Sequence, residues 1–177
     1  MPEVTGIDHI YIAVSDMARS ESFYDRVMTV LGFRKSAFSI GGDPHIQYYN
    51  RHFGFVLRSA RGGGHDPYQP GLHHFCLRVD SAADVADAAR QLLAAGIPAT
   101  EPRLYPDYAP DYTATFLTDP DGIRLEVTNY RQERRDRHDR WDEDRAGAIK
   151  NPRSGNAESA GYKDGEDTAR ISAPPGR

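Results

Sequence analysis

An internal repeat constrains this chain more than any other feature of its sequence. Residues 6–14 and residues 71–79 alternate apolar and polar side chains in the same phase. His9 and His74 occupy the same point in the two segments, 65 residues apart. A period of two is typical of a β-strand with two different faces. The repeat therefore predicts two similar units in tandem, each opening with a strand.

Each opening strand precedes a helical pattern with its own start and stop signals. Asp16 is the expected N-cap of the first helix and Gly32 its end; the second runs from Ser81 to Gly96. Asp84 lies three residues after Ser81, which is the spacing of a capping box. The apolar positions with helical spacing are Phe23, Tyr24, Val27 and Leu31 in the first helix and Val85, Ala88, Ala89 and Leu92 in the second.

Further strand-like runs follow each helix. They lie near residues 46–49 and 54–57 in the first unit, and at 113–117 and 123–128 in the second, with a strong turn signal at 119–122. Each unit is thus expected to read strand, helix, strand, strand, with a further short strand. One helix covers only one face of so small a sheet, so the other unit is expected to close the second face. The expected fold is α+β, with curved sheets around a cavity.

The alternation also predicts which side chains line that cavity. With the apolar positions under the helices, the opposite faces of the opening strands carry His9, Tyr11 and Ala13, and His74, Cys76 and Arg78. The last strand adds Arg124, Glu126 and Thr128. A single inward histidine is more often a structural residue than a ligand. Two matched imidazoles and one carboxylate, however, form a common divalent-metal set with open positions. We therefore predict that His9, His74 and Glu126 bind a metal.

These motifs resemble the vicinal oxygen chelate superfamily, the glyoxalase, bleomycin resistance protein and extradiol dioxygenase group. The likeness covers residues 5–130, as modules of about 5–61 and 70–130, and its most specific part is the run from Phe116 to Glu126 with its Asp-Pro-Asp-Gly turn. The resemblance implies two paired βαβββ modules around one divalent ion. It places the metal ligands at His9, His74 and Glu126, and it leaves Fe²⁺, Mn²⁺, Ni²⁺ and Zn²⁺ open as the ion.

Glyoxalase I-like members of this family usually have a fourth ligand at the end of the first module. Gly54 and Gly122 are 68 residues apart, and this offset aligns Arg58 with Glu126. Arginine stays protonated and cannot bind a metal. The departure favours a face of three ligands, as in the ring-cleaving dioxygenases and the fosfomycin-modifying members.

Several other side chains are candidates for substrate binding. Arg58 has the planar fork that suits an anionic group, with an ordinary ion pair as the alternative. Tyr108 and Tyr112 lie in a ring-rich loop, 104–112, which would act as a lid or simply pack on the surface. The other candidates facing the cavity are Tyr11, His45 and Arg124. Cys76 is expected to be a small filler rather than a nucleophile, and no catalytic residue is assigned.

Composition excludes several classes of protein. The single cysteine rules out an internal disulfide framework, and no apolar run is long enough to span a bilayer. No signal peptide is evident and the net charge is −4, so we expect a cytoplasmic protein that binds neither nucleic acid nor membrane. In residues 131–177, 21 of 47 residues are charged, which predicts a tail that is helical at first and then disordered.

The expected function is divalent-metal-dependent chemistry of the glyoxalase/dioxygenase type on a small oxygenated metabolite. The ion would act as a Lewis acid on chelated substrate oxygens. Lyase or isomerase chemistry, iron-dependent ring-cleaving oxygenation and thiol transfer of the fosfomycin type all remain open. A metal-free drug- or metabolite-binding protein of the bleomycin-resistance type is the main alternative, and an unliganded structural dimer is another. By analogy with the family, a homodimer is expected.

Overall fold

The structure is a computed structural model, and it describes residue 2 and residues 4–141. The chain divides into a unit of residues 1–138 and a unit of residues 139–177, and the fold below is that of the first unit. The disordered tail expected from the sequence lies largely outside the described residues. Within the described part of the chain, no helix is both long and apolar enough to cross a membrane.

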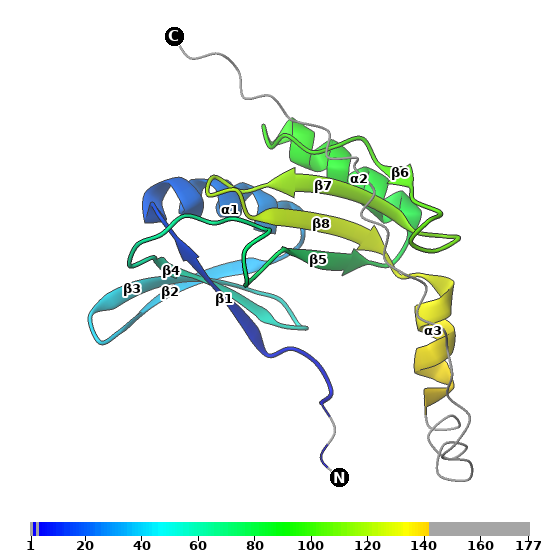
Figure 1. The fold of residues 1–177 in the computed structure, drawn as a ribbon, viewed down its shortest axis with the longest axis horizontal. Coiled ribbons are helices and arrows are strands. Elements are labelled where there is room, and N and C mark those ends of the chain that lie inside the picture. Colours follow the sequence, from blue (N-terminus) through cyan, green and yellow to red (C-terminus); the bar gives the residue numbers. More distant parts are fainter. Residues whose placement is uncertain (1, 3, 142–177) are drawn as a thin grey trace. The chain divides into compact units, whose positions relative to one another are not determined.

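The first module is a four-stranded sheet with one helix (Figure 1). Its elements are β1 (His9–Val14), α1 (Met17–Val30), β2 (Arg34–Ile40), β3 (Asp43–Tyr49) and β4 (Gly54–Ser59). The strand order is β1-β4-β3-β2, in which β1 and β4 are parallel and the other pairs antiparallel.

The second module repeats this plan. Its elements are β5 (His74–Val79), α2 (Ala82–Ala94), β6 (Arg103–Leu104), β7 (Thr113–Thr118) and β8 (Arg124–Asn129), and α3 (Gln132–Asp139) follows. The order β5-β8-β7-β6 has the same pattern of parallel and antiparallel pairs. The tandem repeat and the α+β βαβββ fold expected from the sequence are confirmed.

The capping signals act as expected. The Asp16 side chain accepts a hydrogen bond from the Arg19 backbone N–H at 3.0 Å, and Ser81 and Asp84 form a reciprocal capping box. Capping groups of this kind satisfy backbone donors that a helix leaves unpaired at its first turn. The expected stripe of α2 is buried throughout, as are Phe23, Tyr24 and Val27 of α1.

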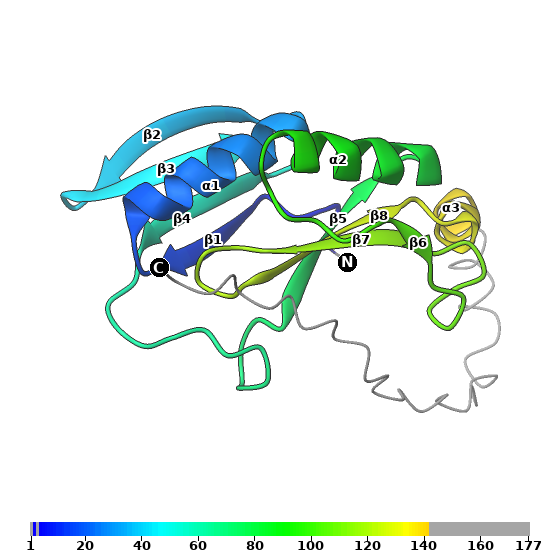
Figure 2. The same cartoon turned by 90° about the horizontal axis from the view of Figure 1, so that it is seen from above.

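The two modules are joined mainly through α1. The Tyr24 hydroxyl donates to Asp119 Oδ2 at 3.0 Å, and the Ser15 backbone N–H donates to Asp121 Oδ2 at 2.8 Å. Arg19 also donates to Asp121, at 2.8 Å. The Asp-Pro-Asp-Gly turn of the second module is therefore hydrogen-bonded to α1 and to Ser15 just before it. Figure 2 shows α1 and α2 on the same side of the sheets.

A second set of contacts between the two modules involves the end of α2 and the apolar core. Arg26 of α1 donates to the carbonyl oxygens of Ala95 and Gly96 at the end of α2, at 3.3 Å each. Below the helices, the rings of Phe55 and Phe75 lie 5.1 Å apart in one continuous apolar core. The helix-covered sides of the two modules thus pack against each other.

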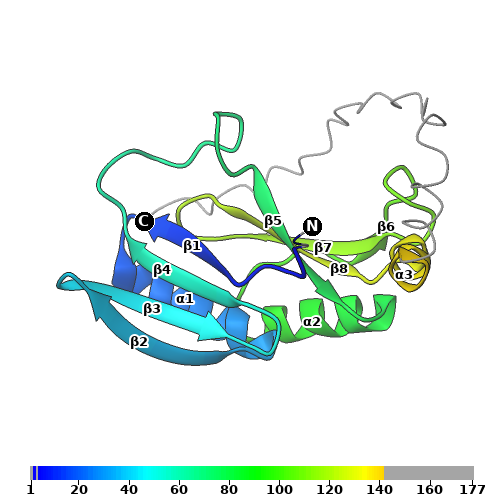
Figure 3. The same ribbon diagram turned by 90° about the horizontal axis from the view of Figure 1, so that it is seen from below.

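This packing changes one expectation about the cavity. The two sheets stay separate and do not close around a common space within the chain (Figure 3). On the faces opposite the helices, His9 and Tyr11 of β1 and His74 and Cys76 of β5 are exposed. Because the modules use their helix sides to bury apolar surface together, these opposite faces remain available for other contacts.

Replacing Asp119 with asparagine is expected to remove one pH-dependent contribution to stability. Burial raises the pKa of the Asp119 carboxyl above its usual range. The folded chain then binds this proton more tightly than the unfolded chain, whose aspartates titrate near pH 4, so this contribution falls as pH rises from about 4 through the folded pKa. Urea unfolding between about pH 3.5 and 7 should show a shallower decline in D119N. An unchanged slope would contradict the assignment.

Candidate functional site

The second module brings two of the three predicted metal ligands together. His74 and Glu126 lie on the neighbouring parallel strands β5 and β8, and the Nε2 atom of His74 is 3.5 Å from Oε2 of Glu126. Glu126 is only 4% exposed, and its Oε1 atom accepts a hydrogen bond of 2.6 Å from the Tyr112 hydroxyl. Cys76 pairs with Glu126 in the strand register. We call His74, Cys76, Tyr112 and Glu126 half-site 2.

The electrostatics of half-site 2 centre on the buried carboxylate. Although Cys76 lies on an exposed sheet face, partial desolvation of its thiol, followed by the charge of Glu126, raises the thiol pKa to about 12. Burial and the hydrogen bond to Glu126 likewise raise the pKa of the Tyr112 phenol above its usual range. Both groups are therefore protonated at neutral pH. The protonated Tyr112 hydroxyl donates its hydrogen bond to the Glu126 carboxylate.

The thiol of Cys76 is expected to resist alkylation. In chelator-treated protein at pH 8, iodoacetamide should modify Cys76 at least about 100-fold more slowly than free cysteine, because the thiolate is the nucleophile. The substitution Glu126→Gln should accelerate the reaction, since it removes a charge that raises the thiol pKa. Mass spectrometry over time measures both rates, with the exposed Glu101→Gln as control. Reaction at the rate of free cysteine would show that the surroundings of Cys76 do not raise its thiol pKa.

The first module carries a separate group, which we call half-site 1: His9, Tyr11 and His45. The three rings follow one another across the sheet, with centroids 5.4 Å apart for His9 and Tyr11 and 5.7 Å for Tyr11 and His45. The Nδ1 atom of His9 lies 2.6 Å from Asp8 Oδ2, and Nδ1 of His45 lies 2.9 Å from the Asp43 carbonyl oxygen. A pocket of about 280 Å³ borders His9.

The single chain does not assemble the complete predicted ligand set. Among the described residues, no group of three or more His, Cys, Asp or Glu side chains is placed to hold a metal ion. His74 and Glu126 meet in half-site 2, whereas His9 contacts Asp8 and Tyr11 in half-site 1. A three-ligand ion therefore needs a ligand from outside the chain, or a different arrangement of the modules.

The strand registers correct the position assigned to Arg58. In the first module Tyr11 pairs with Val56, and at the equivalent point of the second module Cys76 pairs with Glu126. Val56, not Arg58, therefore stands where Glu126 stands. Arg58 lies two residues further along β4, where it contacts Asp43 at 3.4 Å.

The glycine offset misplaced Arg58 because the two glycines are not equivalent. Gly54 is paired inside the sheet as the first residue of β4, whereas Gly122 lies in the turn before β8. The conclusion about ligands is unchanged, since Val56 is a buried hydrocarbon side chain and cannot bind a metal.

The remaining substrate candidates gather on the second module. Arg124 donates to the Tyr68 hydroxyl at 3.2 Å and lies over its ring. Tyr108 stacks on Tyr105 with centroids 5.7 Å apart, and its ring also contacts the edge of Tyr112 at 5.4 Å. The loop before β7 thus forms an aromatic wall beside half-site 2, consistent with its ring-rich sequence.

Sequence reasoning missed two neighbours of the predicted ligands. Asp8 contacts Nδ1 of His9, and the Nδ1 atoms of His73 and His74 lie 2.7 Å apart. Alternation along a strand places adjacent residues on opposite faces, so neither contact was expected. However, β1 begins at His9 and β5 at His74, so Asp8 and His73 precede the strands and are free of that rule. Their adjacency in the sequence was the available signal.

Comparison with known proteins places the chain in a family. Residues 6–127 match the Glyoxalase/Bleomycin resistance protein/Dioxygenase superfamily. Comparison with curated protein sequences found no significant match. Among solved structures, the chain is similar to a glyoxylase/bleomycin resistance protein/dioxygenase domain from Frankia sp. EAN1pec, with 23% identity, a TM-score of 0.60, and coverage of 73% of this chain and 100% of that one.

Two further solved structures are similar to the chain. The fosfomycin resistance protein FosX from Listeria monocytogenes is 13% identical with a TM-score of 0.55, covering 75% of this chain and 99% of its own. Lactoylglutathione lyase from Agrobacterium tumefaciens is 20% identical with a TM-score of 0.50, covering 72% and 94%. At such identities these likenesses show the fold alone. The family match over most of the chain shows more: this protein belongs to the Glyoxalase/Bleomycin resistance protein/Dioxygenase superfamily.

Proposed function

We propose that this protein is a divalent-metal-dependent enzyme of the glyoxalase/dioxygenase type, with its metal held between two copies of the chain. His74 and Glu126 of one copy and His9 of the other would be the ligands. The observation that carries the proposal is the 3.5 Å contact between the exposed His74 side chain and the buried Glu126 carboxylate. His9 is presented at the equivalent place on the exposed face of the other module.

A symmetric dimer meets the requirement for an outside ligand. In a two-fold dimer, half-site 1 of each copy can face half-site 2 of the other, which yields two equivalent sites. One carboxylate and two imidazoles suit a first-row divalent ion with open coordination positions. The buried Glu126 carboxylate supports this fit, because a charge in such a place needs a partner.

Outer partners orient the proposed ligands in both half-sites. Asp8 holds Nδ1 of His9 and His73 contacts Nδ1 of His74, so Nε2 is the nitrogen left to bind an ion in each case. Tyr112 donates to one oxygen of Glu126 and leaves the other toward His74. Such outer hydrogen bonds fix the ring and carboxylate orientation that a ligand requires.

The bound ion would supply Lewis-acid activation of oxygens on a small oxygenated metabolite. The chain's own contribution is to orient the ligands and to surround the substrate with the rings of Tyr11 and Tyr108 and the cations of Arg58 and Arg124. Lyase or isomerase chemistry and iron-dependent ring cleavage are both compatible with this arrangement, as is thiol transfer of the fosfomycin type.

Metal analysis of purified protein tests the proposal. After loading with Fe²⁺ (anaerobically), Mn²⁺, Ni²⁺ or Zn²⁺, the wild type should retain about one ion per chain with at least one of them. The variant His74→Ala should retain little of that ion, while His138→Ala in α3 should behave as the wild type. Equal metal content in wild type and His74→Ala would overturn the proposal.

Oxygen uptake on catechols then separates the chemistries. Oxygen consumption with the Fe²⁺ form alone identifies the oxygenase branch. No oxygen consumption with any ion leaves the lyase, isomerase and transferase branches.

The lack of a three-ligand group within the described chain favours one other candidate, a metal-free binding protein of the bleomycin-resistance type. Tight ligand binding in the presence of a chelator would identify that function.

A further inference from the structure

A larger pocket, of about 860 Å³, opens between the two modules. It shares the β3–β4 turn with the small pocket beside His9, but no residue of half-site 1 or half-site 2 lines it. The proposed function therefore makes no use of it. Its volume is in the range typical of small-molecule sites. Its apolar lining consists of Val30, Leu31, Val79 and Ala88.

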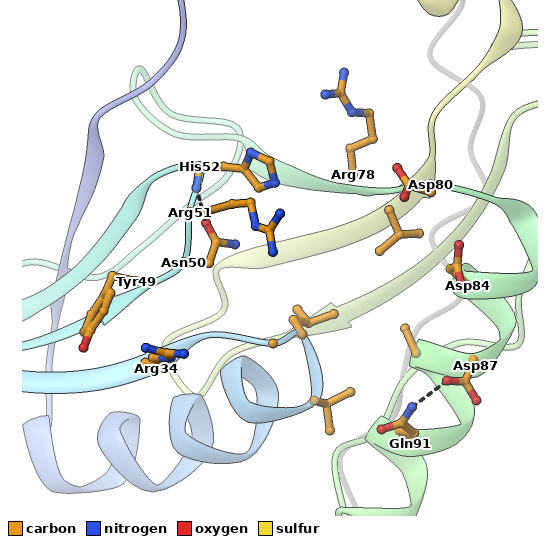
Figure 4. A pocket seen from close by; sticks show the side chains of 15 residues that line it. Arg34, Tyr49, Asn50, Arg51, His52, Arg78, Asp80, Asp84, Asp87 and Gln91 are labelled. Atoms are coloured by element: carbon orange, nitrogen blue, oxygen red, sulfur yellow. Dashed lines mark hydrogen bonds between the residues drawn. The ribbon is translucent and has the colours of Figure 1, made fainter.

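The two sides of this pocket carry opposite charges. The first module contributes Arg34 at the start of β2 and Arg51 in the β3–β4 turn. The second module contributes Asp80 at the end of β5, and Asp84 and Asp87 on α2. It also contributes Arg78, whose guanidinium lies over the Tyr130 ring at 3.9 Å from its centroid. Figure 4 shows Arg34 and Arg51 on one side of the opening and Asp84 and Asp87 on the other, with Arg78 near Asp80.

The two arginines of the first module are open to an outside ligand. Within residues 4–141, neither Arg34 nor Arg51 has an ion pair or a side-chain hydrogen bond. On the opposite side, Asp84 caps α2 through Ser81, and Asp87 binds the side chains of Arg90 and Gln91. Two guanidinium groups that line the same pocket attract an anion.

A simple anion does not match the whole pocket, because the three carboxylates on the opposite side would repel it. A ligand with an anionic group at one end and a cationic group at the other complements both sides. Between these ends it would need an apolar body to cover Val30, Leu31 and Ala88.

We propose that this pocket binds a small zwitterion with an apolar body, of the size of a free dipeptide. Its carboxylate contacts Arg34 and Arg51, where the guanidinium fork can form paired hydrogen bonds. Its ammonium group lies against Asp80 and Asp84. The site is independent of the proposed metal centre, so it can be tested in protein kept free of metal.

Calorimetry with the full chain and excess chelator provides the first test, using alanyl-phenylalanine as the probe. The free dipeptide should bind, and the N-acetylated and C-amidated forms should each bind at least about tenfold more weakly, because each lacks one charge. Binding should weaken as salt is raised. Free phenylalanine, run in parallel, distinguishes a site for amino acids from one for dipeptides: tighter binding of the amino acid would overturn the dipeptide assignment.

Substitutions then locate the site. The double variant R34Q/R51Q should bind alanyl-phenylalanine at least about tenfold more weakly than the wild type, and so should D80N. Asp80 is chosen over Asp84 because Asp84 also caps a helix. The control R61Q/R137Q removes the same charge outside the pocket and should keep wild-type affinity. Circular dichroism checks that each variant is folded.

Three further results would overturn the proposal. The first is no binding up to about 10 mM dipeptide. The second is equal affinity for the free and blocked dipeptides, which would show that the charged sides do not recognise the ligand. The third is equal weakening in R61Q/R137Q and R34Q/R51Q, which would indicate a general charge effect.

Discussion

A mixture of His9→Ala and Glu126→Ala chains is expected to recover metal binding that neither variant has alone. If the metal lies between two copies, every site in either homodimer lacks a ligand. In a mixed dimer, both substitutions fall in one site, and the other site has His9 from the Glu126→Ala chain and half-site 2 from the His9→Ala chain. Random pairing at equal amounts makes half of the dimers mixed, so recovery should reach about one quarter of the wild-type content.

Coexpression of two differently tagged chains, followed by sequential affinity purification, isolates the mixed dimer for metal analysis. The matched control pairs His74→Ala with Glu126→Ala. Both substitutions lie in half-site 2, so each site of that mixed dimer keeps a defect and no recovery is expected. A site built within one chain gives no recovery in either mixture, and that result would contradict the shared site while leaving the family assignment intact.

Replacing Asp119 with alanine is expected to have the largest effect on stability, a loss of about 3 kcal/mol in the free energy of unfolding. Asp119 is 5% exposed, and it accepts hydrogen bonds from the Tyr24 hydroxyl and from the backbone N–H groups of Asp121 and Ile123. Alanine leaves the Tyr24 hydroxyl and the two backbone N–H groups without an acceptor at the interface between the modules. A buried donor that has no acceptor destabilises the folded state by the full free energy of its desolvation.

Urea denaturation followed by circular dichroism measures this loss. The control is Asp107→Ala, an exposed aspartate in the loop before β7, which should change stability by less than about 0.5 kcal/mol. The variant Tyr24→Phe should show a smaller loss than Asp119→Ala, because two of the three hydrogen bonds remain. A loss below about 1 kcal/mol in Asp119→Ala would mean that the turn contributes little to the joint.

Much of the fold was predictable because its signals are local. The period of two fixed which side chains of β1 and β5 face away from the helices, and the capping residues fixed where α1 and α2 begin. The strand β2 was not located, because it is largely exposed and shows no apolar alternation. The two-residue strand β6 is too short to produce a pattern.

The candidate site was predictable only in part. His74 and Glu126 were predicted together, since they lie on strands of one repeated module, and the structure places them in contact. The equivalence of Arg58 and Glu126 was wrong, because equivalence follows from strand pairing rather than from the spacing of two glycines. Whether His9 joins His74 on a metal stays a prediction.

By itself, the sequence determined the duplicated module, its helices and the exposed faces that carry His9 and His74. These features depend on side-chain periodicity and capping within short segments, which any single unit already contains. Only the tertiary structure decided how the modules meet. They pack through α1, the turn at Asp119 and the end of α2, because that arrangement buries apolar side chains of both modules in one core and pairs the buried Asp119 with Tyr24. This packing separates the two half-sites, and no local pattern in the chain encodes it.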